Sequence, residues 1–213
     1  MNVTLVAFYG STSDAFSELA GTLQSRLCEE IGDHFRPYPL EQVHCTVVGL
    51  ESERREGEIF HTHGETLDAA RPLDLAGLWA ALETHPSVDI QFGGFRAGDT
   101  EFLSRGEAPY LRSVSIGAQA VAMGWARKRG EFADWRRSFE SFGVRHKWHR
   151  APSDRDDDVY FVLGSVDESL PDGVRARALT AMRDSLAERR TEVVLSGEDL
   201  SFVRYRETTL DLA

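Results

Sequence analysis

The chain has 213 residues, of which 41% are hydrophobic and 10% aromatic, so it can bury a core and is not a disordered protein. The length favours one domain over residues 1–213. The formal net charge of −11 argues against a protein that coats nucleic acid, but it is compatible with a small basic pocket that binds one phosphate.

Hydrophobic periodicity predicts strands and helices interleaved along the whole chain, with no Gly/Ser-rich or Pro-rich linker between two halves. This pattern predicts a single α+β domain. In the first part of the chain we expect a strand over 3–8, a helix that begins after caps at 11–14 and ends at Gly32, a strand over 43–50 and an insertion over 51–70. A helix from Pro72, strands over 88–95 and 110–116 and a helix over about 118–142 follow. The last part is predicted as a polar loop over 145–158 that ends in a solvated acidic run, a strand over 159–166, a helix over 172–186, and strands over 192–195 and 200–205.

A weak internal repeat links two of the predicted strands. The segment VHCTVVG at 43–49 resembles VYFVLG at 159–164, and each follows and precedes a helix. The repeat predicts two pseudo-equivalent lobes, each of which gives a central strand to one cleft.

The first of these strands carries His44 and Thr46. Because side chains alternate along a strand, His44, Thr46 and Val48 are expected on one face, and the apolar residues between them on the core face. An imidazole can move a proton near neutral pH, and a hydroxyl can donate a hydrogen bond to a phosphate oxygen. The pair therefore predicts a phosphate site, although both residues are also compatible with ordinary polar positions on a strand.

This order of elements resembles the two-histidine phosphoesterase superfamily, which includes the RNA 2′,3′-cyclic phosphodiesterases first named as 2′-5′ RNA ligases. The segments FRPYPLEQVHCTVVGL and VVLSGEDLSFVRY carry the resemblance, which covers most of the chain apart from 51–70. It implies a bilobal α+β fold with antiparallel sheets around a central cleft. It also implies two facing His-x-Thr/Ser motifs: one histidine acts as the base, the other protonates the leaving oxygen, and the two hydroxyls hold the phosphate without a metal or cofactor.

The second motif departs from that pattern. Tyr160 stands where the second histidine is expected, and Val162 where the second hydroxyl is expected. We therefore expect His44 to act as general acid or base, Thr46 to hold the phosphate and Tyr160, which keeps its proton at neutral pH, to take the second role. His146 or His149, in the loop upstream of Tyr160, is an alternative for the second role. The structural interpretation of Tyr160 is a half-buried aromatic residue in a sheet.

Further residues are candidates for substrate binding. Arg204 and Arg206 share one face of the last predicted strand, and Arg36 precedes the first motif. All three are candidates to pair with a phosphate, with plain solvent exposure as the alternative. Trp148 and His149 lie in the basic, aromatic segment RHKWHR, where an indole can stack on a base.

A metal site is the third hypothesis. His61 and His63 lie two residues apart and, with Glu65 or with His146 and His149, have the ligand types that zinc prefers. No third ligand stands at a recognised spacing, so polar loop histidines are the simpler interpretation.

Two functions remain. The first is a metal-independent phosphoric diester hydrolase that acts on a 2′,3′-cyclic phosphate of a nucleotide or short RNA end, with only the first motif intact. The alternative is a non-catalytic module that binds a nucleotide or phosphorylated ligand in the same cleft. No apolar run approaches the ~20 residues that span a bilayer, and two cysteines make no disulfide framework, so we expect a cytoplasmic protein without a membrane or duplex nucleic-acid partner.

Overall fold

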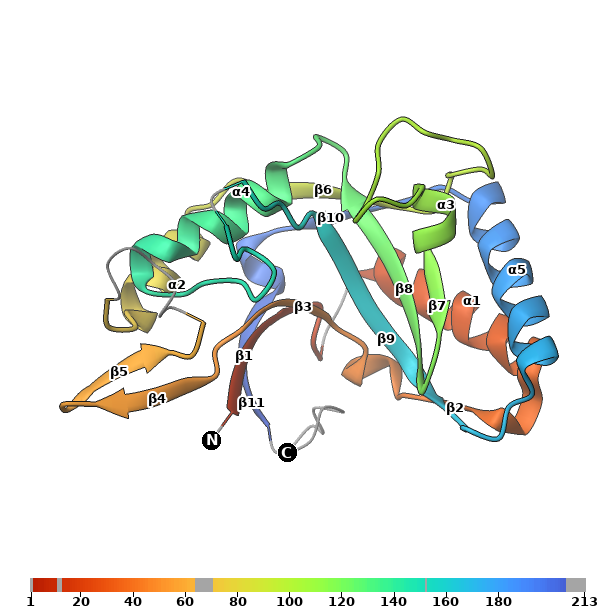
Figure 1. Ribbon diagram of the computed structural model, residues 1–213, viewed down its shortest axis with the longest axis horizontal. Coiled ribbons are helices and arrows are strands. Elements are labelled where there is room, and N and C mark those ends of the chain that lie inside the picture. Colours follow the sequence, from red (N-terminus) through yellow and green to blue (C-terminus); the bar gives the residue numbers. More distant parts are fainter. Residues whose placement is uncertain (1, 11–12, 64–70, 152, 206–213) are drawn as a thin grey trace.

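The computed structural model describes residues 2–10, 13–63, 71–151 and 153–205 and shows one large antiparallel sheet flanked by helices (Figure 1). This confirms the α+β prediction. The main path of the sheet runs in the spatial order β10 (Thr191–Leu195), β6 (Val88–Phe92), β8 (Gln119–Ala126), β9 (Asp158–Val166), β3 (Cys45–Gly49), β1 (Asn2–Ala7) and β11 (Leu200–Tyr205). Two short strands join it, β2 (Phe35–Pro37) on β9 and β7 (Val114–Ile116) on β8, and β4 (Ser52–Arg55) pairs with β5 (Glu58–His61) in a separate hairpin.

The helices gather at the two ends of the sheet. In Figure 1, α1 and α5 lie side by side at one end, whereas α2 and α4 lie at the other. The helices are α1 (Asp14–Ile31), α2 (Leu75–Glu83), α3 (Pro109–Arg112), α4 (Glu131–Ser138) and α5 (Asp172–Glu188), with short 3₁₀ turns at Gly32–His34, Leu40–Gln42, Phe139–Phe142 and Gly197–Asp199.

Helix α1 begins and ends where its sequence signals predict. The Ser13 hydroxyl accepts a hydrogen bond from the Phe16 N–H, which satisfies one of the unpaired amides at the helix start. Gly32 ends the helix with a φ of 52°, a conformation that glycine adopts without a steric penalty. The apolar residues at helical spacing along α1 are buried in the main core: Phe16, Leu19, Ala20, Leu23 and Leu27.

The two central strands, β3 and β9, meet at one ladder pair, Cys45 with Phe161, and both residues are fully buried. We refer to this contact as the β3–β9 junction. The face prediction for β3 is correct for His44 and Thr46, which are half-buried, but wrong for Val48, which is buried. A register shift between β1 and β3 leaves one extra residue on β3, so Val48 turns to the core face.

The predicted helix over 118–142 is wrong in its first half, which is strand β8. Six of the eight residues of β8 are buried, because β6 and β9 flank it and side chains pack on both faces. Small residues permit this: a Cβ at Gly124 would lie 2.5 Å from the Phe92 ring and 2.7 Å from the Gln91 carbonyl oxygen. Gly124, which weakens the predicted helix, is thus a close-packing position of a central strand.

Other predictions also need correction. Residues Pro109–Arg112 form a helical turn before β7, and the first part of the supposed insertion is the β4–β5 hairpin. The acidic run is not solvated: Asp156 and Asp158 are buried against arginines, and Asp157 accepts backbone N–H bonds at the start of α4.

The two lobes remain a prediction, because the strands join into one sheet across the β3–β9 junction. Within the described ranges, no helix is both long enough and apolar enough to cross a membrane.

We expect Gly124→Val to lower the free energy of unfolding by about 1–3 kcal/mol, because the new side chain would overlap Phe92 and the β6 backbone. Chemical denaturation measures the change. Gly117→Ala is the matched control, since a Cβ there meets nothing within 4 Å. Equal stabilities of the two variants would contradict this account of β8.

Candidate active site

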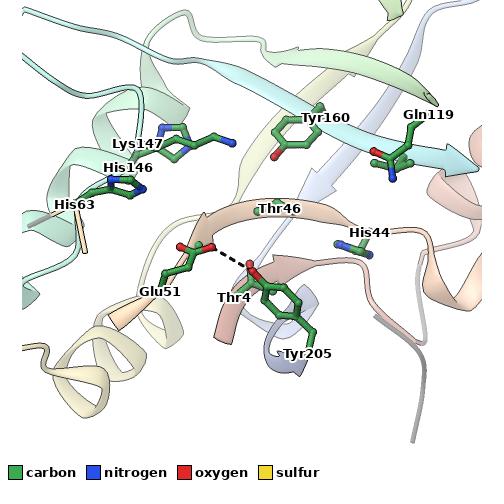
Figure 2. Close-up of a pocket in the computed structure, with 12 residues that line it drawn as sticks. Thr4, His44, Thr46, Glu51, His63, Gln119, His146, Lys147, Tyr160 and Tyr205 are labelled. Atoms are coloured by element: carbon green, nitrogen blue, oxygen red, sulfur yellow. Dashed lines mark hydrogen bonds between the residues drawn. The ribbon is translucent and has the colours of Figure 1, made fainter. Parts of the chain in front are cut away.

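A pocket of about 370 Å³ lies over the β3–β9 junction. It brings together the three residues predicted to be catalytic. Its lining consists of Thr4, His44, Thr46, Gly49, Glu51, His63, Gln119, His146, Lys147, Tyr160, Val162 and Tyr205. Figure 2 shows His44 and Gln119 at one end, His63, His146 and Lys147 at the other, and Thr46 and Tyr160 between them. The pocket is therefore elongated, with hydrogen-bond donors along its length.

His44 lies immediately before β3 and is fixed by its backbone neighbours. Its Nδ1 lies 2.7 Å from the Gln42 carbonyl oxygen, which can only accept, so Nδ1 carries the proton and Nε2 carries the lone pair. Burial lowers the pKa of His44, although the bond to Gln42 opposes that shift. At neutral pH the ring is thus a neutral imidazole with one acceptor atom, which is the state required of a general base.

The register at the junction determines which pocket residues face each other. Because Cys45 pairs with Phe161 in an antiparallel ladder, Thr46 lies beside Tyr160 and His44 lies beside Val162. All four of these neighbours line the pocket. The hydroxyls of Thr46 and Tyr160 therefore enter the pocket from adjacent strands, whereas Val162 offers no donor opposite His44.

The loop after α4 contributes His146 and Lys147 to the pocket lining. His146 is one of the alternative second histidines, whereas Lys147 is not among the residues predicted from the sequence. His146 is buried with Nδ1 3.4 Å from Asp156 Oδ2 and without a hydrogen-bond partner for Nδ1 in the described chain. Burial, and next the charge of Arg136, strongly lower the pKa of His146, so its ring is neutral at pH 7.

The last strand contributes Tyr205 rather than the predicted Arg204. Thr4 lines the pocket and pairs with Val203 on β11, so the pocket face of β11 is that of Val203 and Tyr205. Arg204 is exposed on the other face, and Arg206 lies outside the described residues. The alternation of side chains along β11 follows from the sequence. Which of its two faces points to the pocket depends on the β1–β11 register, which the sequence does not show.

Tyr205 donates a hydrogen bond of 3.1 Å to Glu51 Oε1 at the pocket floor (Figure 2). Burial, followed by the Glu51 carboxylate, raises the pKa of Tyr205 and keeps its phenol protonated. Arg36, by contrast, is exposed on β2 and does not line this pocket. Trp148 and His149 line a second pocket, which shares His63, His146 and Lys147 with the first.

A fully buried arginine connects the two sides of the pocket. Arg136 on α4 donates to the Thr46 carbonyl at 3.2 Å and to the Val47 carbonyl at 2.8 Å. It also donates to Asp156 Oδ2 at 3.1 Å and to the Asp158 carbonyl at 2.9 Å. One guanidinium thus joins the strand that carries Thr46 to the segment that leads into β9.

The surroundings of His61 do not support the hypothesis of a metal site. His61 uses both ring nitrogens in the fold: Nε2 donates to the Gly49 carbonyl at 2.9 Å, and Nδ1 accepts the N–H groups of His63 and Arg145. Among the described residues, no group of three or more histidine, cysteine or carboxylate side chains is arranged to hold a metal ion. Glu65, a proposed ligand, lies outside the described residues.

No protein-family model and no curated protein matches the sequence. Among solved structures, the chain is similar to a conserved protein of unknown function from Agrobacterium tumefaciens, at 17% identity and a TM-score of 0.38, over 86% of this chain and 73% of that one. It is also similar to Usb1 from Kluyveromyces marxianus, at 10% identity and a TM-score of 0.40, over 94% of this chain and 96% of that one. The function is therefore inferred from the pocket itself.

We expect Arg136→Met to lower the free energy of unfolding by about 3–5 kcal/mol, because it breaks a buried ion pair. The Asp156 carboxylate keeps only the partly exposed Arg105 as an arginine partner, and the Thr46, Val47 and Asp158 carbonyls lose their donor. Urea denaturation checks this value. Arg127→Met, at a half-exposed arginine, is the control and is expected to change stability by less than about 0.5 kcal/mol. A similar loss of unfolding free energy in both variants would contradict the proposed importance of Arg136 for stability.

The stability of the protein should fall as the pH decreases from 6.5 towards 4. Burial, and next the charge of Arg137, lower the pKa of His149 from 6.5 to about 4. The unfolded chain therefore binds a proton in this range that the folded chain does not, and the stability present above pH 6.5 is lost on acidification.

We expect His149→Gln to remove about 1–2 kcal/mol of that fall when unfolding is measured at pH 7 and pH 5. His34→Gln, at a half-buried histidine outside the pockets, should keep the dependence of the wild type. An unchanged pH dependence in His149→Gln would mean that His149 titrates alike in both states.

Proposed function

We propose that this chain is a metal-independent phosphodiesterase of the two-histidine phosphoesterase type, with only its first His-x-Thr motif intact. Its substrate in this proposal is a 2′,3′-cyclic phosphate on a nucleotide or a short RNA end. The observation that carries the proposal is the convergence of His44, Thr46 and Tyr160 on one pocket across the β3–β9 junction.

The chemistry follows from the state of each group. His44 Nε2 accepts a proton from water while the water oxygen attacks phosphorus, and the bond from phosphorus to one ribose oxygen breaks. The Thr46 hydroxyl donates to a non-bridging oxygen and stabilises the negative charge that develops there. The ribose oxygen takes its proton from Tyr160, and the proton held by His44 then returns to the phenolate through solvent.

Tyr160 suits the acid role better than His146 does. The depressed pKa of His146 leaves a neutral imidazole at pH 7, which is a poor proton donor. The Tyr160 phenol has an O–H group that can donate, and it lies beside Thr46 in the strand register. This assignment also gives the substituted second motif a chemical part in the reaction.

Binding without turnover is the second candidate function, and one observation favours it. Val162 lies beside His44, at the position where the resemblance implies a second phosphate-binding hydroxyl. A pocket that lacks this donor stabilises the transition state less. The remaining donors can still bind a phosphorylated ligand without turnover.

We expect the protein to hydrolyse 2′,3′-cyclic nucleotides and a short RNA with a cyclic phosphate end, equally well with and without EDTA. His44→Ala and Tyr160→Phe should each lower kcat by about 10²–10⁴-fold, because each removes a positioned proton-transfer group. His34→Ala, outside the pocket, should leave kcat unchanged. The assay is product formation resolved by chromatography.

Two results would decide against this proposal. Absence of turnover, with nucleotide binding that His44→Ala weakens in calorimetry, would establish the binding module instead. Turnover that survives His44→Ala would place the activity outside this pocket.

A further inference from the structure

A second pocket of about 380 Å³ adjoins the first and shares three of its residues, His63, His146 and Lys147. Its remaining lining is Thr62, Arg145, Trp148, His149 and Arg150. Because the shared residues lie at the end of the first pocket opposite His44, the two pockets continue one into the other away from the proposed reacting group (Figure 2). A ligand that extends from the first pocket away from His44 would occupy both.

Trp148 is the exposed aromatic surface of this second pocket. Its side chain is 39% exposed, whereas the indoles of Trp125 and Trp135 are buried in the fold. The Arg105 guanidinium lies 4.4 Å from the Trp148 ring centroid and is itself held by Asp156 and Asp158. This partly exposed indole, with a fixed cation against its ring, offers an aromatic surface for stacking a nucleobase.

Positive charge surrounds that ring. Lys147 and Arg150 lie 5.6 Å and 5.4 Å from the Trp148 centroid. The ion pairs of the described chain include neither of these two cations, in contrast to Arg105. In a protein with a net charge of −11, this local concentration of cations that form no ion pair with the described residues indicates an anionic ligand.

His149 gives independent evidence for a ligand. Its side chain is fully buried and lines the second pocket, yet neither ring nitrogen has a hydrogen-bond partner within the described part of the chain. Buried polar atoms almost always have partners, so an orphaned imidazole at a pocket wall suggests that the occupant supplies them. A neutral imidazole offers one donor and one acceptor, which suits a base edge or a ribose hydroxyl.

We propose that the second pocket binds the nucleotide that precedes the cyclic phosphate in an RNA strand. The base stacks on Trp148, the phosphate that links the two nucleotides lies near Lys147 and Arg150, and His149 forms hydrogen bonds with the base or ribose. The inference rests on the proposed function, because it takes the first pocket as the site of the terminal phosphate. It makes an RNA end of at least two nucleotides, rather than a cyclic mononucleotide, the preferred substrate.

The test compares a mononucleotide with a dinucleotide. Calorimetry measures the binding of adenosine 3′-monophosphate and of the dinucleotide ApA with a 3′-phosphate, both of which are unreactive. We expect Trp148→Leu to weaken dinucleotide binding about tenfold, since stacking is lost, and to leave mononucleotide binding nearly unchanged. Trp148→Phe keeps an aromatic face and should retain most of the affinity.

The charge prediction has its own matched pair of variants. Arg150→Gln should weaken dinucleotide binding and reduce its dependence on salt, because one phosphate contact is removed. Arg127→Gln, which lies outside both pockets, should change neither. With the cyclic forms of both ligands, Trp148→Leu should raise KM for the dinucleotide alone.

The outcomes separate this inference from the proposed function. Without any turnover, a dinucleotide preference that depends on Trp148 would still support the second pocket. Equal losses for both ligands in Trp148→Leu, or no loss for either, would overturn it. Binding of an acidic peptide as tightly as the dinucleotide, with the same dependence on Trp148, would overturn the assignment to RNA.

Discussion

The buried guanidinium of Arg136 is the interaction on which the pocket depends. It forms hydrogen bonds with backbone carbonyls of β3 and of the segment that leads into β9, and it is paired with the Asp156 carboxylate. A charge at that depth is costly unless all its donors are used, so the surrounding carbonyls are held in one arrangement. The positions of Thr46 and Tyr160 relative to each other follow from that arrangement.

A second side chain performs the same task at the other end of the junction. Gln24, on α1, donates to the Tyr38 carbonyl at 2.7 Å and to the Leu163 carbonyl at 2.8 Å. It thus connects the approach to the first motif with β9. The two motif strands share one ladder pair, so these buried polar side chains, rather than a long row of backbone hydrogen bonds, hold the pocket walls together.

Local patterns in the sequence predicted those parts of the fold that depend on local chemistry. The caps of α1, the β9 strand and the half-buried face of His44 and Thr46 follow from propensity and alternation. Strand β8 is not predicted, because its alanines favour a helix locally and its strand conformation depends on pairing with β6 and β9.

The pocket residues outside the first motif were harder to predict for a related reason. Tyr205 and Lys147 reach the pocket through a strand register and a loop path that are properties of the whole sheet. The sequence around the acidic run predicts a solvated loop, because the arginines that pair with it in the structure lie elsewhere in the chain. Sequence reasoning located the first motif, and tertiary pairing decided what faces it.

The β3–β9 junction also determines when in folding the pocket can exist. The bond from Arg136 to Val47 spans 89 residues, and that from Gln24 to Leu163 spans 139. Closing such long loops is slow, because chain entropy is lost before any contact forms. During synthesis, β3 leaves the ribosome well before α4 and β9. The edge of β3 that pairs with β9 in the folded protein therefore stays unpaired until β9 has been made. The region proposed for chemistry is thus among the last to assemble, and it is where a nascent chain would most need protection from aggregation.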